Sequence, residues 1–464
     1  MGKGQRVSTG LPASIRVESI TDVSDQIRLG RRSCVQTVEH CLGRIDELES
    51  HIRAWVIVDR QGALAQARRL DEELAQGRWR GLLHGIPIGI KDIVDVQDFP
   101  TAAGSRLWAQ EIATEDATIV ERLRRAGAVI LGKTVTTQYA CFDPPITCNP
   151  WNAQRTPGGS SSGSAAAVAC GMCLGAIGSQ TGGSITRPAS YCGVAGCKPS
   201  YGRVSTAGVR PLAPSMDHPG PIAHSVRDLA ILLEAIAGPD ERDPLCATVP
   251  APKLVASLDS PSALPSRIGV VRGIFEDLAE LPVRRLIQRV IETLTAKHAV
   301  VRELALPASF NDVLRSHRAI MAVEAAAIHQ QRLAEHPDDY QPRIRQLIEE
   351  GLATTAPQYV RAKWHQQSVT REIGDSFRDV DVLLTPATLG PPPDISTTGD
   401  PAFNSPWSFT GLPTVSFPVT LTDDGLPLAI QLVGHGLKEV ELFRCALWCE
   451  QNLRDLKGEL FNGP

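Results

Sequence analysis

The stretch from Thr156 to Pro199 constrains this chain most, because it places two clusters of glycine and serine close together. Ser160 belongs to the first cluster and Ser184 to the second. Glycine permits tight turns and the close approach of backbone to ligand. A serine that follows such a turn, at the start of a helix, has its hydroxyl beside unpaired backbone N–H groups. Such N–H groups stabilise an oxyanion, so the stretch predicts a nucleophilic serine site.

Each cluster opens a segment of small residues. After Thr156-Pro157-Gly158, we expect a helix that begins near Ser164, with the preceding serines as its cap. In the second cluster, a short strand ends at Gly178, a turn spans 179–183, and a small helix begins at Ser184. A flexible Gly/Ser linker is the alternative for the first cluster. We reject it, because an apolar helix and strand follow without a polar spacer.

Lys91 lies in the strand-like segment that we expect over 85–96, on the same face as Gly89. One interpretation is a lysine at a strand end that reaches toward water or pairs with Asp92 or Asp95. The other is a catalytic base. An ordinary lysine is almost entirely protonated at neutral pH, whereas burial disfavours the ammonium and lowers the pKa by roughly 2–3 units. A buried Lys91 would therefore be able to accept a proton.

Composition excludes several classes of protein. The chain has 464 residues, 42% of them apolar and 21% charged, with a net charge of −4 and no Lys/Arg run. This balance argues against nucleic acid and favours a small-molecule partner. Met1–Leu11 has no apolar core for a signal peptide, and the longest apolar stretch, 165–178, is too short to cross a membrane. The 11 scattered cysteines fit a reducing compartment, so we predict a cytoplasmic protein.

Other motifs are weaker. Cys170 and Cys173 form a C-x-x-C, but no second pair stands at zinc-finger spacing, so buried thiols are the better interpretation. No phosphate-binding G-x-x-x-x-G-K-[ST] occurs. Ser161 is the middle of a G-x-S-x-G, but a strand does not precede it. His218 and His224 lie in a proline-rich stretch that we expect to be a loop, where their role would be structural.

Helical and strand-like segments alternate along the chain, which indicates an α/β protein with buried strands. Ser33 and Gln36 predict a capping box, and a capped helix is expected over 116–126. A Pro-rich surface segment is expected over 238–265, and a largely helical region over 309–377 with breaks at Pro337 and Pro342. No linker divides the chain, so we expect an N-terminal tail over 1–19 and a single domain over 20–464.

Three segments together resemble the amidase signature family: GIPIGIKD at 85–92, GGSSSGSAAAVA at 158–169 and the stretch that begins GSQTGGSITRPAS at 178. The similarity extends over most of the chain from about Ile20 and is thinnest over 250–373. It implies one large mixed β-sheet flanked by helices. It also implies amide hydrolysis by a Ser–Ser–Lys triad, without metal or cofactor.

In that resemblance Ser184 is the nucleophile and Lys91 the final base, neutral in the resting enzyme. Ser160, which the family associates with a cis peptide, relays the proton between them. The N–H groups of Thr181, Gly182, Gly183 and Ser184 form the oxyanion hole. The resemblance thus gives the bridging hydroxyl a role like that of histidine in other triads.

Departures from the family pattern bear on the substrate. Gln180 stands where many members have Asp, and the arginine, Arg187, lies three residues after Ser184 instead of two. This arrangement is similar to malonamidase-like members, in which that arginine binds a substrate carboxylate. A guanidinium is suited to this task, but pairing of Arg187 with a structural acid or with backbone carbonyls is an equal alternative. The low aromatic content, 5%, favours a small polar amide such as a malonamate.

Other functions stay open. The chain could be the A-type glutaminase subunit of a tRNA-dependent amidotransferase, although Val135 and Gln138 replace the Asn and Glu usual there. A hydrolase of urea derivatives is another alternative. A non-catalytic binding module is disfavoured because all three triad positions are filled. The sequence leaves open whether the protein forms a homodimer.

Overall fold

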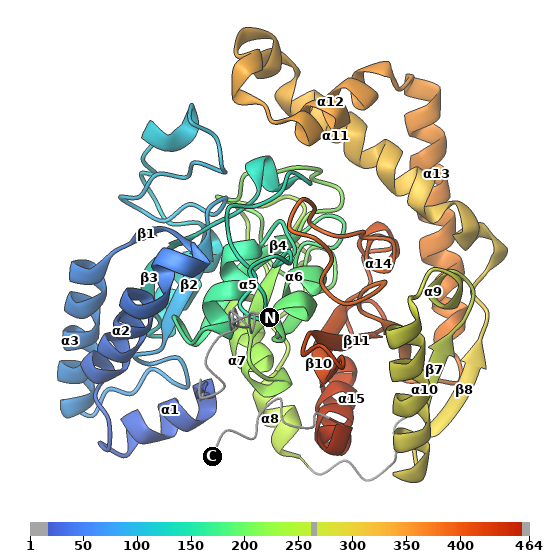
Figure 1. The fold of residues 1–464 in the computed structure, drawn as a ribbon. Helices are drawn as coiled ribbons and strands as arrows, with labels where there is room; N and C mark the ends of the chain where they lie inside the picture. The colour runs from blue at the N-terminus through green and yellow to red at the C-terminus, as the bar shows by residue number, and fades with distance from the viewer. Residues whose placement is uncertain (1–16, 261–266, 457–464) are drawn as a thin grey trace, which may run out of the picture.

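The computed structural model describes residues 17–260 and 267–456. Most of the predicted N-terminal tail, residues 1–16, therefore lies outside the described part. The described strands form one mixed sheet of 11 strands, and helices flank it, as predicted (Figure 1). Strands from both ends of the chain contribute, since β10 and β11 lie between β5 and β9.

In spatial order the strands of the sheet are β1 (Trp55–Val58), β3 (Val129–Thr134), β2 (Pro87–Lys91), β4 (Gly175–Gln180), β6 (His218–Ala223), β5 (Ala195–Lys198), β10 (Thr414–Leu421), β11 (Pro427–Val433), β9 (Val382–Pro386), β7 (Arg267–Val271) and β8 (Val300–Leu304). β2 is parallel to both β3 and β4, whereas β4 and β6 are antiparallel. The central strands are buried along their whole length, which explains their continuous apolar sequences.

The α-helices are α1 (Ile20–Arg28), α2 (Cys34–Ile52), α3 (Arg60–Ala75), α4 (Thr118–Arg125), α5 (Ser162–Ala169), α6 (Thr186–Cys192), α7 (Val226–Ile236), α8 (Leu254–Asp259), α9 (Ile274–Asp277), α10 (Leu281–Ala296), α11 (Val313–Glu335), α12 (Pro342–Ala353), α13 (Ala356–Glu372), α14 (Ser405–Phe409) and α15 (Glu439–Asn452). α11 packs against α12 and α13, and these three helices extend away from the sheet (Figure 1). The largely helical region expected over 309–377 is thus confirmed, with Pro337 and Pro342 at its breaks.

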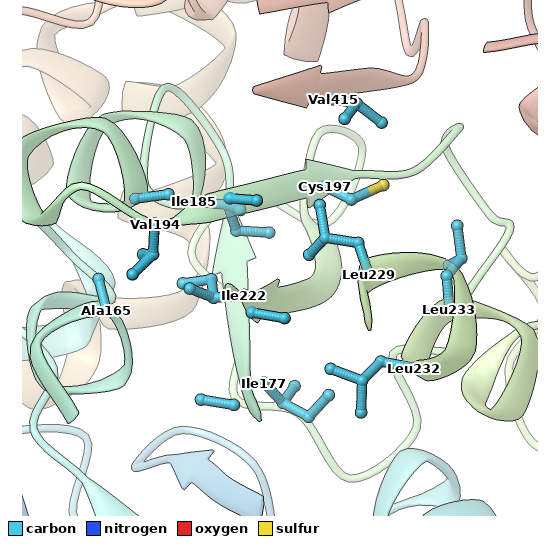
Figure 2. Packing of buried hydrophobic residues seen from close by; sticks show 14 of the residues in the cluster. Ala165, Ile177, Ile185, Val194, Cys197, Ile222, Leu229, Leu232, Leu233 and Val415 are labelled. Atoms are coloured by element: carbon cyan, nitrogen blue, oxygen red, sulfur yellow. The ribbon is translucent and has the colours of Figure 1, made fainter. Parts of the chain in front are cut away.

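The core lies on both sides of the central strands. Figure 2 shows Ala165 of α5 on one side of these strands and Leu229 and Leu232 of α7 on the other. Ile177 of β4 and Ile222 of β6 lie between them, and all five side chains are fully buried. α5 approaches the sheet closely, because it is built from alanine, glycine and serine.

A glycine near the start of α5 is required by this close approach. A Cβ atom on Gly163 would lie 2.2 Å from the carbonyl oxygen of Ala54 and 2.4 Å from the amide nitrogen of Val135. Any side chain there would push α5 away from the strands beneath it. The cluster of small residues therefore brings the serines before α5 against the sheet.

Several local predictions need correction. The helix expected over 116–126 is α4, but its N-cap is Ala117, because the Asp116 carboxylate bonds to the Gln97 amide and to Arg124. His218 opens the buried strand β6, so it does not lie in a loop. The prolines there are compatible with β6 because few of its residues pair on both sides. The surface segment over 238–265 contains a helix, α8, within its described part.

The register of β2 and β4 positions the site. Ile90 pairs with Ile177 in parallel, so both strands end at the same edge of the sheet. Lys91 is the last residue of β2, and Ser179 and Gln180 end β4. Because neighbouring parallel strands end together, the lysine strand and the second serine cluster meet at this edge. Within the described residues, the longest apolar helical segment falls short of what a bilayer crossing requires.

Candidate active site

Lys91 is bonded to serine hydroxyls at the edge of the sheet. Its Nζ donates to Oγ of Ser160 at 2.7 Å and to Oγ of Ser179 at 2.8 Å. The backbone carbonyl of Ser179 lies at 3.5 Å from the same nitrogen. Lys91 and Ser160 are fully buried. The structure thus brings together the predicted base and the predicted relay, which lie 69 residues apart in the sequence.

The interpretation in which Lys91 pairs with Asp92 or Asp95 is wrong. Asp92 forms an ion pair with Lys133, with an N–O distance of 3.1 Å, and both side chains are buried. Asp92 therefore points away from the amine of Lys91, toward β3, and Lys91 does not reach solvent.

The environment of Lys91 favours the neutral amine. Burial lowers the pKa of Lys91 to about 7, and the negative charge of Asp217 opposes this effect. Removal from water penalises an ammonium that has no ion-pair partner. Near neutral pH a substantial fraction of Lys91 is therefore unprotonated and able to accept a proton.

The serines that precede α5 do not cap it. The peptide bond between Gly159 and Ser160 is cis, in agreement with what the resemblance implies. Ser161 is the N-cap of α5, but its Oγ accepts from the amide of Ser179 at 3.2 Å and donates to the carbonyl of Ser179 at 3.3 Å. The Ser161 hydroxyl therefore joins the first cluster to the end of β4. The amide of Ser161 donates to the carbonyl of Ser184 at 3.3 Å, which joins the two clusters directly.

The loop between β4 and α6 leaves backbone donors free. Within the described part of the chain, the N–H groups of Gly182, Gly183 and Ser184 have no hydrogen-bond partner. Buried N–H groups without a partner are rare, and Ser184 is only 6% exposed. The Ser184 hydroxyl likewise makes no hydrogen bond within the described residues. These groups are thus available to a ligand.

Side chains from both sides of the loop hold it. The carboxamide oxygen of Gln180 accepts from the amides of Ile185 and Thr186, each at 3.0 Å, so Gln180 caps the helix that we expected at Ser184 and that begins at Thr186. The Ser408 hydroxyl donates to the carbonyl of Gly182 at 3.1 Å. A Cβ atom on Gly183 would lie 2.6 Å from Oδ1 of Asn404, so this position requires glycine.

Arg187 is fully buried next to the first cluster. Its Nη2 donates to the carbonyl of Gly159 at 2.7 Å and to Oγ1 of Thr398 at 3.3 Å. Its Nε and Nη1 have no partner among the described residues. Burial lowers the pKa of Arg187 to about 10, with Tyr191 and Asp400 opposing, so the guanidinium remains charged at neutral pH. Nη2 therefore holds the backbone before Ser160, and the donors Nε and Nη1 are free within the described residues.

A cleft of about 450 Å³ lies beside the loop, and Ser408 is one of its lining residues. Lys363, Gln366 and Arg371 of α13 form one wall, and the turn over 408–411 forms another. Ligand sites for small molecules are typically of this size. The region that the sequence left undefined thus contributes side chains close to the glycine loop.

The remaining sequence candidates lie in structural positions. His218 Nδ1 is 2.6 Å from the carbonyl of Met216, and His224 Nε2 is 2.7 Å from that of Val168. Cys170 and Cys173 are buried free thiols. In the described residues no group of three His, Cys, Asp or Glu side chains is arranged to hold a metal ion.

Three residues near the site were not found from the sequence. Ser179 contacts Lys91, Asp217 accepts a hydrogen bond from the Thr181 hydroxyl, and His317 Nε2 is 2.8 Å from the Thr181 carbonyl. A polar residue at the end of a buried strand is a signal that would have drawn attention to Ser179. Asp217 and His317 come from the start of β6 and from α11, whose position relative to the loop depends on the tertiary fold.

A buried lysine bonded to a serine hydroxyl, beside free backbone N–H groups and a second serine, is typical of hydrolases that act through a serine. The family model described as Amidase matches residues 36–443. The chain therefore belongs to the amidase family and is a hydrolase of amide C–N bonds.

The similarity to individual relatives extends over nearly the whole chain. A putative amidase, AmiD, of Mycobacterium tuberculosis is 37% identical over 446 residues, which cover 92% of each chain. The A-type component of the glutamyl-tRNA(Gln) amidotransferase of Prochlorococcus marinus is 33% identical over 473 residues, which cover 94% of this chain and 97% of that one. These relatives include both an amidase and a component of an amidotransferase.

Solved structures agree with the fold. A structure described as a vestigial protein complex that reveals the evolutionary origins of an s-triazine catabolic enzyme has a TM-score of 0.89 at 30% identity, and the match covers 94% of this chain and 98% of that one. The peptide amidase of Stenotrophomonas maltophilia has a TM-score of 0.84 at 29% identity and covers 97% of this chain and 100% of that one.

Proposed function

We propose that the chain hydrolyses a small amide through an acyl-enzyme on Ser184. The observation that carries this proposal is the 2.7 Å hydrogen bond between Lys91 Nζ and Ser160 Oγ, next to a loop with free N–H groups. Oγ of Ser184 attacks the amide carbonyl carbon as its proton passes to Ser160, which gives a proton to Lys91. The N–H groups of Thr181, Gly182, Gly183 and Ser184 stabilise the oxyanion.

The leaving amine then receives a proton from Ser160, and Lys91 returns the proton to Ser160. Water attacks the acyl-enzyme by the same relay, which releases the carboxylate and frees Ser184. Lys91 serves as the base because its pKa lies near neutrality and its amine is not paired with a carboxylate. The proposed steps involve only side chains of this protein and water.

We also propose that the preferred substrate is a small amide that carries a carboxylate, such as a malonamate. Two free donors of Arg187, Nε and Nη1, are buried and without a partner among the described residues, and they support this proposal. Nε and Nη1 lie on opposite sides of the guanidinium, so a substrate carboxylate would pair with one of them in a charge-assisted hydrogen bond. The limited exposure of Ser184 favours a small molecule. Hydrolysis of urea derivatives is an alternative for the same site.

The experiment is a screen of small amides for ammonia release, with a fluorophosphonate probe as an independent readout. We expect the probe to label the wild-type protein and to fail with Ser184→Ala, because only an activated serine reacts. The panel should include malonamate, a neutral amide of the same size, an aryl amide and biuret. A protein that neither reacts with the probe nor releases ammonia would contradict the proposal.

A second candidate function is that of an A-type glutaminase within an amidotransferase, because a relative of that kind is 33% identical over nearly the whole chain. Gln138 argues against it. Its carboxamide donates to the carbonyl of Asp339 and accepts from the amide of Gln341 at 2.7 Å, so its side chain serves the contact with the helical region. Co-purification with two partner proteins, together with glutaminase activity, would favour this second function.

We further propose that residues 20–464 fold as one domain. β10 and β11 are inserted between strands from earlier in the chain, so the two halves share one sheet. Limited proteolysis should yield no stable fragment of half the chain, whereas two stable fragments would contradict the proposal.

A further inference from the structure

We propose that Asp217 is a positioning residue for this reaction: its carboxylate holds Thr181, the first residue of the oxyanion loop, and supplies negative charge beside Lys91. The inference rests on the proposed function, in which Thr181 and Lys91 take part. Nothing in the sequence motifs around Ser160 and Ser184 assigns a role to Asp217, which lies just before β6.

The sheet brings Asp217 to the loop. β4 and β6 are antiparallel, and Gln180 pairs with His218 at the end of the ladder. Thr181 follows Gln180, and Asp217 precedes His218, so the two residues meet directly beyond the last pair. Asp217 is therefore positioned by the same strand that ends in the glycine loop.

Burial raises the pKa of Asp217, and the hydrogen bonds that its carboxylate accepts oppose this effect and favour the ionised form. Oδ1 accepts a hydrogen bond from the Thr181 hydroxyl, and Oδ2 accepts from the amides of Leu212 at 2.9 Å and Ala213 at 3.1 Å. Three donors that converge on one buried group satisfy the charged form. Lys91 contacts Ser179, and Asp217 contacts Thr181 two residues further along, so the amine and the carboxylate lie at the same end of β4.

Thr181 is thereby held at two points. Its hydroxyl donates to Asp217, and its carbonyl is 2.8 Å from Nε2 of His317 on α11. A carbonyl can only accept, so Nε2 of His317 carries the proton. Two contacts on one residue restrict the orientation of the following peptide N–H groups, which an oxyanion hole requires.

The charge of Asp217 also acts on Lys91. It is the one charged group that opposes the effect of burial on the pKa of Lys91. The other titratable groups around Asp217 are Glu324 on α11, Tyr201, and the neighbouring His218. Burial lowers the pKa of His218 and of His317, so both rings are neutral near pH 7. Lys198 lies near His218, and burial lowers its pKa to about 7.

The test compares two variants that separate charge from hydrogen bonding. Asp217→Asn removes the charge at constant size, so the midpoint of the acid limb of kcat/KM should move to lower pH by roughly half a unit or more. Thr181→Val removes the hydrogen bond and leaves the charge. It should lower kcat about tenfold without moving the midpoint, and Thr181→Ser should restore kcat. If Asp217→Asn does not fold, Asp217→Ser removes the same charge and can replace it in this comparison.

An unchanged midpoint in both charge-removing variants would overturn the inference, as would an equal shift in Thr181→Val. Because the substrate is not known, the pH dependence of the rate of fluorophosphonate labelling can be used to compare the midpoints of the wild type and the variants. If the wild-type protein is not labelled at Ser184, the proposed function fails. If it is labelled and Asp217→Asn has the same pH profile, only the role of Asp217 fails.

Discussion

Nζ of Lys91 lies 2.7 Å from Oγ of Ser160, and no carboxylate of the described residues forms an ion pair with this amine. A buried lysine is more often paired with an acid, which would keep it protonated. Here hydroxyl groups hold it, and a hydroxyl can accept from an ammonium or donate to a neutral amine. The same contacts therefore remain possible before and after proton transfer.

Removal of the proposed triad should abolish hydrolysis. We expect Ser184→Ala and Lys91→Met each to lower kcat by about 10⁴-fold or more, because the residues act as a unit. Ser162→Ala is the matched control. Ser162 is also buried in the first cluster, but its hydroxyl makes only a 3.5 Å contact with the carbonyl of Val135. Steady-state rates on one amide, with melting temperatures, measure the effect; near-normal activity in Lys91→Met would contradict the mechanism.

Activity should rise with pH through about pH 7. The pKa of Lys91 is lowered to about 7, so below that pH the amine is protonated and cannot act as a base. The measurement is kcat/KM from pH 5 to 9. Burial also raises the pKa of Asp228 to about 7, so Asp228→Asn is the control and should leave the midpoint unchanged. A shift of the midpoint in Asp228→Asn would contradict the assignment of this pKa to Lys91. A value of kcat/KM that falls between pH 6 and 8 would contradict it as well.

Ser179 should matter for the turnover rate more than for substrate binding. Ser179→Ala removes one of two hydroxyl partners of Lys91, and a single hydrogen bond contributes about 1 kcal/mol. We expect kcat to fall about 3- to 10-fold with little change in KM, and Ser179→Thr to restore most of it. If Ser179→Ala has the kcat of the wild type, the second hydroxyl does not position the amine.

Arg187 should distinguish substrates if one of its free donors binds a carboxylate. Arg187→Met should then raise KM about 10- to 100-fold for malonamate and much less for a neutral amide of the same size. Loss of the hydrogen bond to the Gly159 carbonyl would lower kcat for both substrates alike. Equal losses on the two amides would therefore remove the carboxylate role and leave Arg187 as a structural residue.

The ion pair of Asp92 and Lys133 should contribute to stability. Both side chains are buried, and Lys133 Nζ also donates to the Pro100 carbonyl at 3.1 Å and to Oγ1 of Thr101 at 3.0 Å. Asp92→Asn leaves a buried ammonium without its partner, which should cost about 3–5 kcal/mol. The double variant Asp92→Asn/Lys133→Met should recover part of this loss. Chemical denaturation measures the free energy of unfolding of both variants. If Asp92→Asn is as stable as the wild type, the prediction is contradicted.

Local patterns of the sequence predicted much of the fold. The apolar segment that contains Lys91 was predicted to be a strand and forms β2, and the capping box predicted at Ser33 is present. The caps of α4 and α5 were predicted wrongly, because Asp116 and Ser161 bond to distant segments instead. β6 was missed because its prolines are typical of a loop, and only its neighbours in the sheet make it a strand.

By itself the sequence determined where the reactive groups stand along the chain: a lysine that ends an apolar strand and serines that follow glycine turns. These depend on local chemistry, which neighbouring residues supply. Only the tertiary structure decided which groups meet. The parallel pairing of β2 and β4 brings Ser179 to Lys91, and the antiparallel pairing of β4 and β6 brings Asp217 to Thr181. Register between distant strands depends on packing over the whole sheet, so no single segment encodes it.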